Sequence, residues 1–384
     1  MMTVNAVTNP GQSVTLTRAS AQWANRPADE RHESIKALRD AAYMHRERSS
    51  EEVIDLSTSR LTWRDDEILL DDKKMNHWAF GQLCTKLKAP ANYMRTLPAD
   101  IALQNLKHGL GVNVLPNDQS KLLIGPSHIG AFTGPAYARI WNAEIADWLV
   151  ELQDAQPHWT FPESFKTASG EKAEAWGEKK ELPVAFLSDR DMFVFLCDYE
   201  HGVEVPGAPN LLSRGFWVEN NEVGSGSVRI TMFLFDFVCS NVLVWGARNV
   251  LEVKIAHKGR ARERVLFDDS EARKAIAEYA NRSAYADTLR IQRAQNLLVA
   301  DTTIEVVDSL YARRLPGLTK NVLAEAMLVA GRTERYQLGA GPNSVWGVIN
   351  GLTEVSQKSE HADARIEIDR SAARILDMMV PEEG

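Results

Sequence analysis

The sequence predicts an α+β protein with a central, curved, mainly antiparallel sheet, packed helices and a helical C-terminal region. Two observations carry this prediction. Strand-like runs gather between residues 121 and 255, and the patterns after Phe267 have helical spacing. Strands and helices in separate blocks favour segregated α+β packing, whereas regular alternation of the two would indicate a parallel, doubly wound sheet.

The strand-rich tract runs from Arg214 to Arg264. Within it, Gly224-Ser225-Gly226 separates two strand-like runs, which is typical of a tight hairpin, and the runs are Gly215–Val223 and Ser227–Cys239. Successive side chains of a strand point to opposite faces, so one face of the second run is wholly apolar and comprises Val228, Ile230, Met232 and Leu234. Further strands are expected at Val184–Leu187, Met192–Leu196, Val242–Trp245 and Val250–Ile255.

The N-terminal half combines helices with a second hairpin. Asn76 is a favourable N-cap for a helix whose apolar residues follow at helical spacing, namely Phe80, Leu83, Cys84 and Leu87. The segments KLLIG and HIGAF are typical of two strands joined by a turn, and Asn142 is expected to cap the helix that follows. Residues 29–50 are highly charged, which predicts an exposed helix suited to pack on another subunit.

These patterns divide the chain into three parts. Residues 1–28 are polar and show no sustained period, which predicts a flexible N-terminal arm. Residues 29–267 are expected to form the α+β core, with a long surface loop at 155–181. Residues 268–384 are expected to form a helical region packed on that core, and its first helical run is expected from Ser270 to about Ala300.

The composition is that of an ordinary soluble globular protein, with 44% hydrophobic and 25% charged residues. No apolar run reaches the roughly 18 residues that a membrane helix needs, and the N-terminus has no signal-peptide pattern. We therefore expect a cytoplasmic protein without membrane contact. The three cysteines, Cys84, Cys197 and Cys239, are far apart in the sequence, so neither a disulfide framework nor a cysteine-based zinc site is predicted.

The sequence contains no familiar catalytic motif. It has no GxxxxGK[ST], no GxGxxG between a strand and a helix, no HExxH and no GxSxG. The nine histidines show no metal-like spacing, so the chain is expected not to be an enzyme and to need no metal or cofactor. An enzyme acting on nucleotides or nucleic acid would have to use Asp236, Glu219 and Glu222, of which the two glutamates are otherwise expected to be solvated.

One local charge feature closes the strand-rich tract, and it comprises Lys254, Lys258, Arg260, Arg262 and Arg264. The formal net charge of −8 gives no general basic field, so any contact with phosphate must come from a local patch. On an extended segment, residues 258, 260, 262 and 264 project to one side, which suits a sugar-phosphate backbone. Two other interpretations stay open, a solvated edge strand and a surface for an acidic protein partner.

Other basic and aromatic residues could extend such a surface. Single-stranded nucleic acid is held by positive charge together with base stacking on aromatic rings. Arg229, Arg139 and Arg214 are candidates for further phosphate contacts, and Trp141 and Trp217 are candidate stacking platforms.

Three passages resemble domain-of-unknown-function family 932, also described as phage/plasmid-like proteins. They are KLKAPANYMRTLPADIALQNL with the following LLIGPSHIGAFTGPAYARIWNAEIADWL, then GFWVENNEVGSGSVRITMFLFDFVCSNVLVWG, and finally WGVINGLTEVSQKSEHADARIEIDRSAARIL. The resemblance spans roughly residues 55–380. It implies a setting in mobile elements and supplies no catalytic residues.

A second likeness is at the level of the fold alone. The hairpin before a helix at 137–152, followed by a curved sheet and basic residues, is similar to single-strand annealing proteins of the Erf and RecT types. Those proteins form rings or filaments on single-stranded DNA. The chain is thus expected to be an oligomeric nucleic-acid-binding protein, with single-stranded DNA favoured. The alternative is an interaction protein that captures a host factor.

Overall fold

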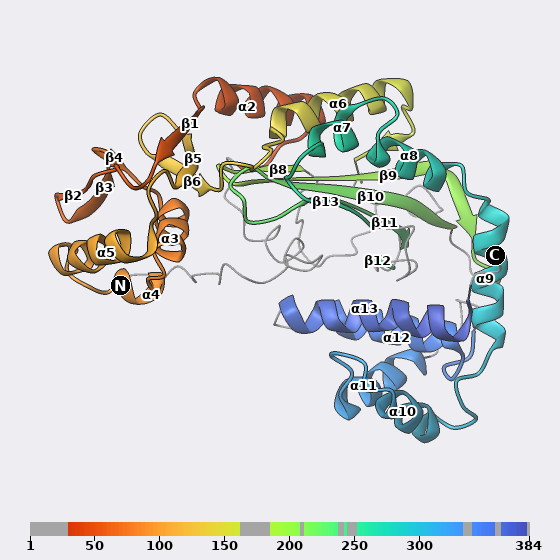
Figure 1. Ribbon diagram of the computed structural model, residues 1–384. Helices are drawn as coiled ribbons and strands as arrows, with labels where there is room; N and C mark the ends of the chain where they lie inside the picture. The colour runs from red at the N-terminus through yellow and green to blue at the C-terminus, as the bar shows by residue number, and fades with distance from the viewer. Residues whose placement is uncertain are drawn as a thin grey trace.

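The computed structural model describes residues 30–161, 185–207, 211–236, 242–243, 252–332, 340–357 and 362–381. The predicted arm at 1–28, most of the predicted loop at 155–181 and Cys239 lie outside these residues. Within the described parts the strands form three sheets, and all their pairings between named strands are antiparallel. The predicted α+β class with a mainly antiparallel sheet is confirmed (Figure 1).

The largest sheet is built on three long strands, β9 (Asp191–Glu204), β10 (Leu211–Asn221) and β11 (Val228–Asp236). Two short strands pair with β9, namely β7 (Trp159–Thr160) and β8 (Ala185–Leu187). Two others pair with β11, namely β12 (Val242–Leu243) and β13 (Glu252–Ile255). The predicted hairpin joins β10 to β11, and Gly224 has a φ of 78° in its turn, a conformation that suits glycine.

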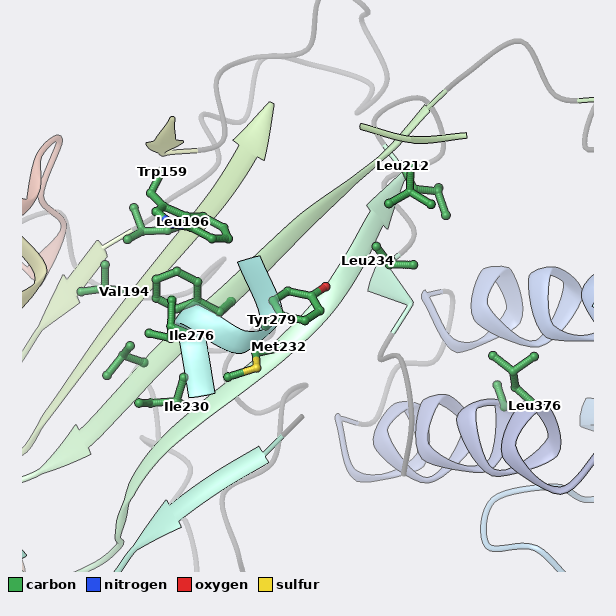
Figure 2. Close-up of a cluster of buried hydrophobic side chains, with 14 of the residues drawn as sticks. Trp159, Val194, Leu196, Leu212, Ile230, Met232, Leu234, Ile276, Tyr279 and Leu376 are labelled. Atoms are coloured by element: carbon green, nitrogen blue, oxygen red, sulfur yellow. The ribbon is translucent and has the colours of Figure 1, made fainter. Parts of the chain in front are cut away.

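One face of this sheet carries the apolar stripe expected from the period-two pattern, since Val228, Ile230, Met232 and Leu234 are all fully buried. Ile276 and Tyr279 lie beside Met232 in the same core (Figure 2). Four helices lie along this side of the sheet in Figure 1, namely α2 (Ile35–Glu47), α6 (Asn142–Ala155), α7 (Ala261–Leu266) and α8 (Glu271–Ala280). Helix α2 packs on α6 and β8 of its own chain through Ile35, Leu38 and Ala42, so its buried side is not free for another subunit.

A smaller unit precedes the large sheet. One of its sheets contains β1 (Ser50–Asp55), β5 (Gln119–Ile124) and β6 (Ile129–Thr133), and the other contains β2 (Leu61–Arg64), β3 (Glu67–Leu70) and β4 (Lys73–Lys74). Its helices are α3 (His77–Lys86), α4 (Ala91–Met94) and α5 (Ala99–Asn113). Asn76 caps α3 as predicted, because its side chain accepts from the Ala79 N–H at 2.8 Å.

This smaller unit has a hydrophobic core of its own. Leu83, Leu106 and Leu122 belong to one buried cluster, whereas the large sheet and the C-terminal helices share another. The residues predicted to form a single α+β core are therefore distributed between these two clusters and a small third one, which comprises Leu123, Ala131 and Val223. This third cluster lies between the two units, beside a group of polar side chains described below.

The remaining helices follow the sheet, as predicted. They are α9 (Ala284–Asn296), α10 (Thr303–Ala312), α11 (Lys320–Ala330), α12 (Val345–Gln357) and α13 (Ala362–Met379). Ser270 caps α8 as expected, but Ser283 caps a new helix, so the long run predicted from Ser270 is broken into two. No helix in the described ranges is long and apolar enough to span a membrane.

Helices α11 and α12 cross at a glycine. A β-carbon added to Gly351 would lie 2.2 Å from the main-chain oxygen of Ala326. Because main-chain atoms of a packed helix cannot move aside cheaply, we expect Gly351→Ala to lower the free energy of unfolding by about 1–3 kcal/mol. Chemical denaturation would measure this loss. Gly111→Ala on the exposed side of α5 is the control, since no atom lies within 4 Å and alanine favours the helix; equal effects of the two changes would contradict the close crossing.

Candidate functional site

The basic residues near the end of the strand-rich tract do not form the predicted extended ladder. Strand β13 ends at Ile255, a turn follows with Gly259 at a φ of 52°, and α7 begins at Ala261. On a helix, residues two apart are separated by about 200° around the axis, so Arg262 and Arg264 point in different directions. The prediction that residues 258, 260, 262 and 264 project to one side is wrong.

We call residues 254–264 the basic segment. Its three arginines are exposed but paired with carboxylates: Arg260 with Glu263, Arg262 with Glu144, and Arg264 with Glu271 at 2.6 Å. Lys254 and Lys258 are exposed, and neither forms an ion pair within the described part of the chain. The basic segment thus presents cations to solvent from a strand end, a turn and a short helix.

The supporting residues predicted on the sheet are buried. Arg214 lies in the core, where its guanidinium donates to Asp287 at 2.8 Å. Arg229 is buried and lies 3.3 Å from a carboxylate oxygen of Glu219 on the neighbouring strand. Trp217 is 2% exposed and stacks on Phe193. In this conformation these residues cannot contact a phosphate or a base, so the predicted surface does not include them.

Arg139 belongs to a different arrangement, which we call the polar junction, and Trp141 packs against its guanidinium. The polar junction comprises Tyr137, Arg139, Asn142, Asn220, Glu222 and His257, and it lies where the chain from β6 to α6 passes the β10–β11 turn. Tyr137 donates its hydroxyl to the carbonyl of Asn221 at 2.9 Å, and Asn220 donates to the Ile140 carbonyl at 2.9 Å. These bonds join the smaller unit to the large sheet.

Arg139 is at the centre of the polar junction. Its side chain is only 1% exposed, and its Nε donates to Glu51 at 2.9 Å. The guanidinium lies over the ring of Tyr137 at 5.2 Å and over that of Trp141 at 5.6 Å. Trp141 therefore packs against cations instead of standing free as a stacking platform, and it is also the N-cap residue of α6, the position predicted for Asn142.

Three titratable groups of the polar junction have strongly shifted pKa values, and burial raises the pKa of Tyr137 well above its usual value. Burial raises the pKa of Glu222 to about 7, and the main-chain N–H of Asn142 opposes this by donating to its carboxylate. Burial lowers the pKa of His257 to about 4, although its Nδ1 lies 3.2 Å from the Ala138 carbonyl. Glu222 was expected to be solvated, and it is instead 2% exposed.

Several buried polar atoms of the polar junction have no hydrogen-bond partner. They are the two terminal nitrogens of Arg139, Nδ2 of Asn142, Oδ1 of Asn220, Oε2 of Glu222 and Nε2 of His257. Donors and acceptors are mixed, which suits bridging by water more than binding of a simple anion or cation. The junction therefore connects the two units, and the protonation of Glu222 and His257 within it depends on pH.

The three carboxylates considered for catalysis do not converge. Glu219 pairs with Arg229, and Glu222 binds the N-terminus of α6. Asp236 lies opposite Leu212 at the far end of the hairpin from Glu219, seven residues along the strand from Arg229 or roughly 23 Å. A catalytic site made of these three residues is therefore excluded by the backbone.

Comparison with known proteins finds a match for only part of the chain. Residues 200–377 match the model of a family described as Domain of unknown function (DUF932). This range contains the whole of the second passage quoted above and the whole of the third, whereas the first passage precedes it. No curated protein and no solved structure matches the chain.

Proposed function

We propose that the protein binds nucleic acid through exposed cations within residues 200–377, the part of the chain that matches the DUF932 family model. The proposed ligand is single-stranded DNA, held by an oligomer of the chain in phage or plasmid recombination, replication or genome protection. The basic segment is the proposed contact. The observation that carries the proposal is the exposure of its five cations along eleven residues of an otherwise acidic chain, from a strand end through a turn to a short helix.

The ion pairs of the basic segment do not prevent such binding. Arg260 and Glu263 are exposed by 83% and 36%, and pairs at such positions contribute only about 0–1 kcal/mol to stability. A phosphate offers an arginine the same bidentate acceptor geometry as a carboxylate. Exchanging Glu263 for a phosphate therefore costs little, and Lys254 and Lys258 need no exchange.

The first test is a charge reversal of the two unpaired lysines. Lys254→Glu/Lys258→Glu is expected to weaken binding of a labelled oligothymidylate about tenfold at low salt, because two phosphate contacts are lost. The slope of log affinity against log salt should also become shallower by about 1.4, at about 0.7 per contact on a single strand. Fluorescence polarisation at several salt concentrations measures both quantities.

The matched control has the same change in charge at exposed sites outside the basic segment. Lys107→Glu on α5 with Arg313→Glu after α10 lowers the net charge equally. If the control weakens binding as much as the test variant, the effect is one of total charge and the basic segment is not the contact. If the unaltered protein binds no oligonucleotide at low salt, the proposal is wrong and the host-factor alternative takes its place.

A further inference from the structure

A second cluster of titratable side chains lies on the large sheet, away from the basic segment and the polar junction. His158, Asp198 and His201 bring one ligand atom each to within 4.8 Å of one another. We call them the His–Asp–His cluster. Their spacing in the sequence is not that of a metal motif, which is why the histidines were expected to have no metal-binding arrangement.

The fold brings these residues together through two features of β9. Strand β7 pairs with β9 so that Trp159 lies opposite Asp198, which puts His158 next to that carboxylate. The pairing of β9 with β10 then shifts: Asp198 lies opposite Arg214, but Val203 lies opposite Leu212. Residues 199–202 must therefore bulge out of the ladder, and this bulge turns His201 back toward Asp198.

The distances are close to those of a coordination sphere. One oxygen of Asp198, Oδ2, lies 2.9 Å from Nδ1 of His201 and 3.9 Å from Nε2 of His158. Ligands bound at 2.0–2.2 Å to a tetrahedral zinc ion are about 3.4 Å apart, so small movements of the rings are sufficient. The side chain of His201 is 61% exposed, which leaves it free to make them.

The surroundings orient the carboxylate. Asp198 is 2% exposed, and its Oδ1 accepts from the main-chain N–H groups of Glu200 at 2.9 Å and His201 at 3.1 Å. Those bonds fix the carboxylate and direct Oδ2 toward both imidazoles, as outer-shell bonds do in metal sites. No lysine or arginine pairs with Asp198 within the described ranges, so a buried negative charge faces only two histidines.

We propose that the His–Asp–His cluster binds one divalent transition-metal ion, with Zn²⁺ as the preferred ion. Two imidazoles and one carboxylate suit zinc and its neighbours, whereas Mg²⁺ and Ca²⁺ prefer all-oxygen sites. Three protein ligands leave at least one position for water or another ligand.

The test uses the full chain, without a histidine tag and stripped of metal, titrated with Zn²⁺ against a chromophoric chelator. One equivalent is expected to bind, and His201→Gln should weaken binding at least tenfold, since even the loss of an outer-shell partner costs about 10–100-fold. Bound Zn²⁺ should also raise the Tm of the unaltered protein, because a ligand that binds only the folded state stabilises it. His201 is exposed, so this variant is expected to fold.

His108→Gln on the exposed surface of α5 is the matched control, and it should bind Zn²⁺ like the unaltered protein. Asp198→Asn is a second variant that keeps an oxygen for the two main-chain N–H groups but removes the charge, and it should also bind weakly. Zn²⁺ binding that His201→Gln leaves unchanged, or no saturable binding at all, would show that the cluster is not a metal site. The result is independent of nucleic-acid binding, because no oligonucleotide is present.

Discussion

Asp287→Ala is expected to lower the free energy of unfolding by about 3–5 kcal/mol. Asp287 on α9 is fully buried, and it accepts from Arg214 on β10 at 2.8 Å and lies 3.0 Å from Nε of Arg282. Removing the carboxylate leaves the guanidinium of Arg214 charged and without a counter-ion inside the core. Urea unfolding followed by tryptophan fluorescence would measure the loss as a lower midpoint at an unchanged slope.

Two further variants separate the buried pair from ordinary surface charge. Asp308→Ala removes an ion pair with Lys320 in which both side chains are 58% exposed, and it should cost far less stability than Asp287→Ala. Arg214→Leu/Asp287→Leu removes both buried charges. It should therefore cost less stability than the losses from Arg214→Leu and Asp287→Leu added together. Strictly additive effects would mean that the two residues do not stabilise each other.

Helices, strands and turns could be predicted where a short stretch of sequence carries the pattern. The alternation in Val228–Leu234 specifies a strand with one apolar face, and Gly224 permits the turn before it. The helix starts at Asn76 and Ser270 could also be predicted, because a capping side chain bonds to a main-chain N–H only three residues away. Such features depend on short-range geometry, and the structure confirms them.

The basic segment shows where this approach fails. The period-two spacing of its cations is compatible with a strand, but this spacing does not predict the residue at which the strand ends. Ala261 and Val265 are buried four residues apart, which is the spacing of a helix turned toward the core. The spacing of Ala261 and Val265 was the sequence signal for this helix. Burial of these two side chains determines the local structure, and the spacing of the charges does not.

The polar junction and the His–Asp–His cluster could not be predicted, since each depends on contacts between distant segments. Glu222 meets Asn142 across the connection of two units, and His158 meets Asp198 only through the register of β7 on β9. A weak signal did exist at Asn220-Asn221-Glu222, a polar run that follows the apolar stretch Phe216–Val218 closely. Polar residues at such a position indicate partners, although the sequence does not name them.

The second large effect that we expect is a change in the stability of the protein with pH, and it comes from the polar junction. The pKa of Glu222 is about 7 in the folded protein and near 4.5 when it is solvated. Between these values the folded chain holds a proton that unfolding releases, so stability is greatest below pH 4.5 and falls until about pH 7. The shift corresponds to about 3 kcal/mol, at about 1.4 kcal/mol for each unit.

His257 acts in the opposite direction. Its pKa is about 4 in the folded protein and 6.5 when it is solvated, so below pH 6.5 unfolding takes up a proton. This contribution to stability is present above pH 6.5 and is lost as the pH falls toward 4, again by about 3 kcal/mol. Between pH 4.5 and 6.5 the two residues oppose each other, and the unaltered protein shows little of either effect.

Single substitutions should reveal both contributions. Glu222→Gln keeps an oxygen for the Asn142 N–H, and its free energy of unfolding relative to the unaltered protein should increase by about 3 kcal/mol from pH 4.5 to 8. For His257→Asn the same difference should decrease by about 3 kcal/mol from pH 4 to 6.5. Urea unfolding across this pH range measures both, with the exposed Glu278→Gln as control. Differences that do not vary with pH would mean that bulk water solvates both groups in the folded protein, so that the junction is open to solvent instead of closed around a few bridging waters.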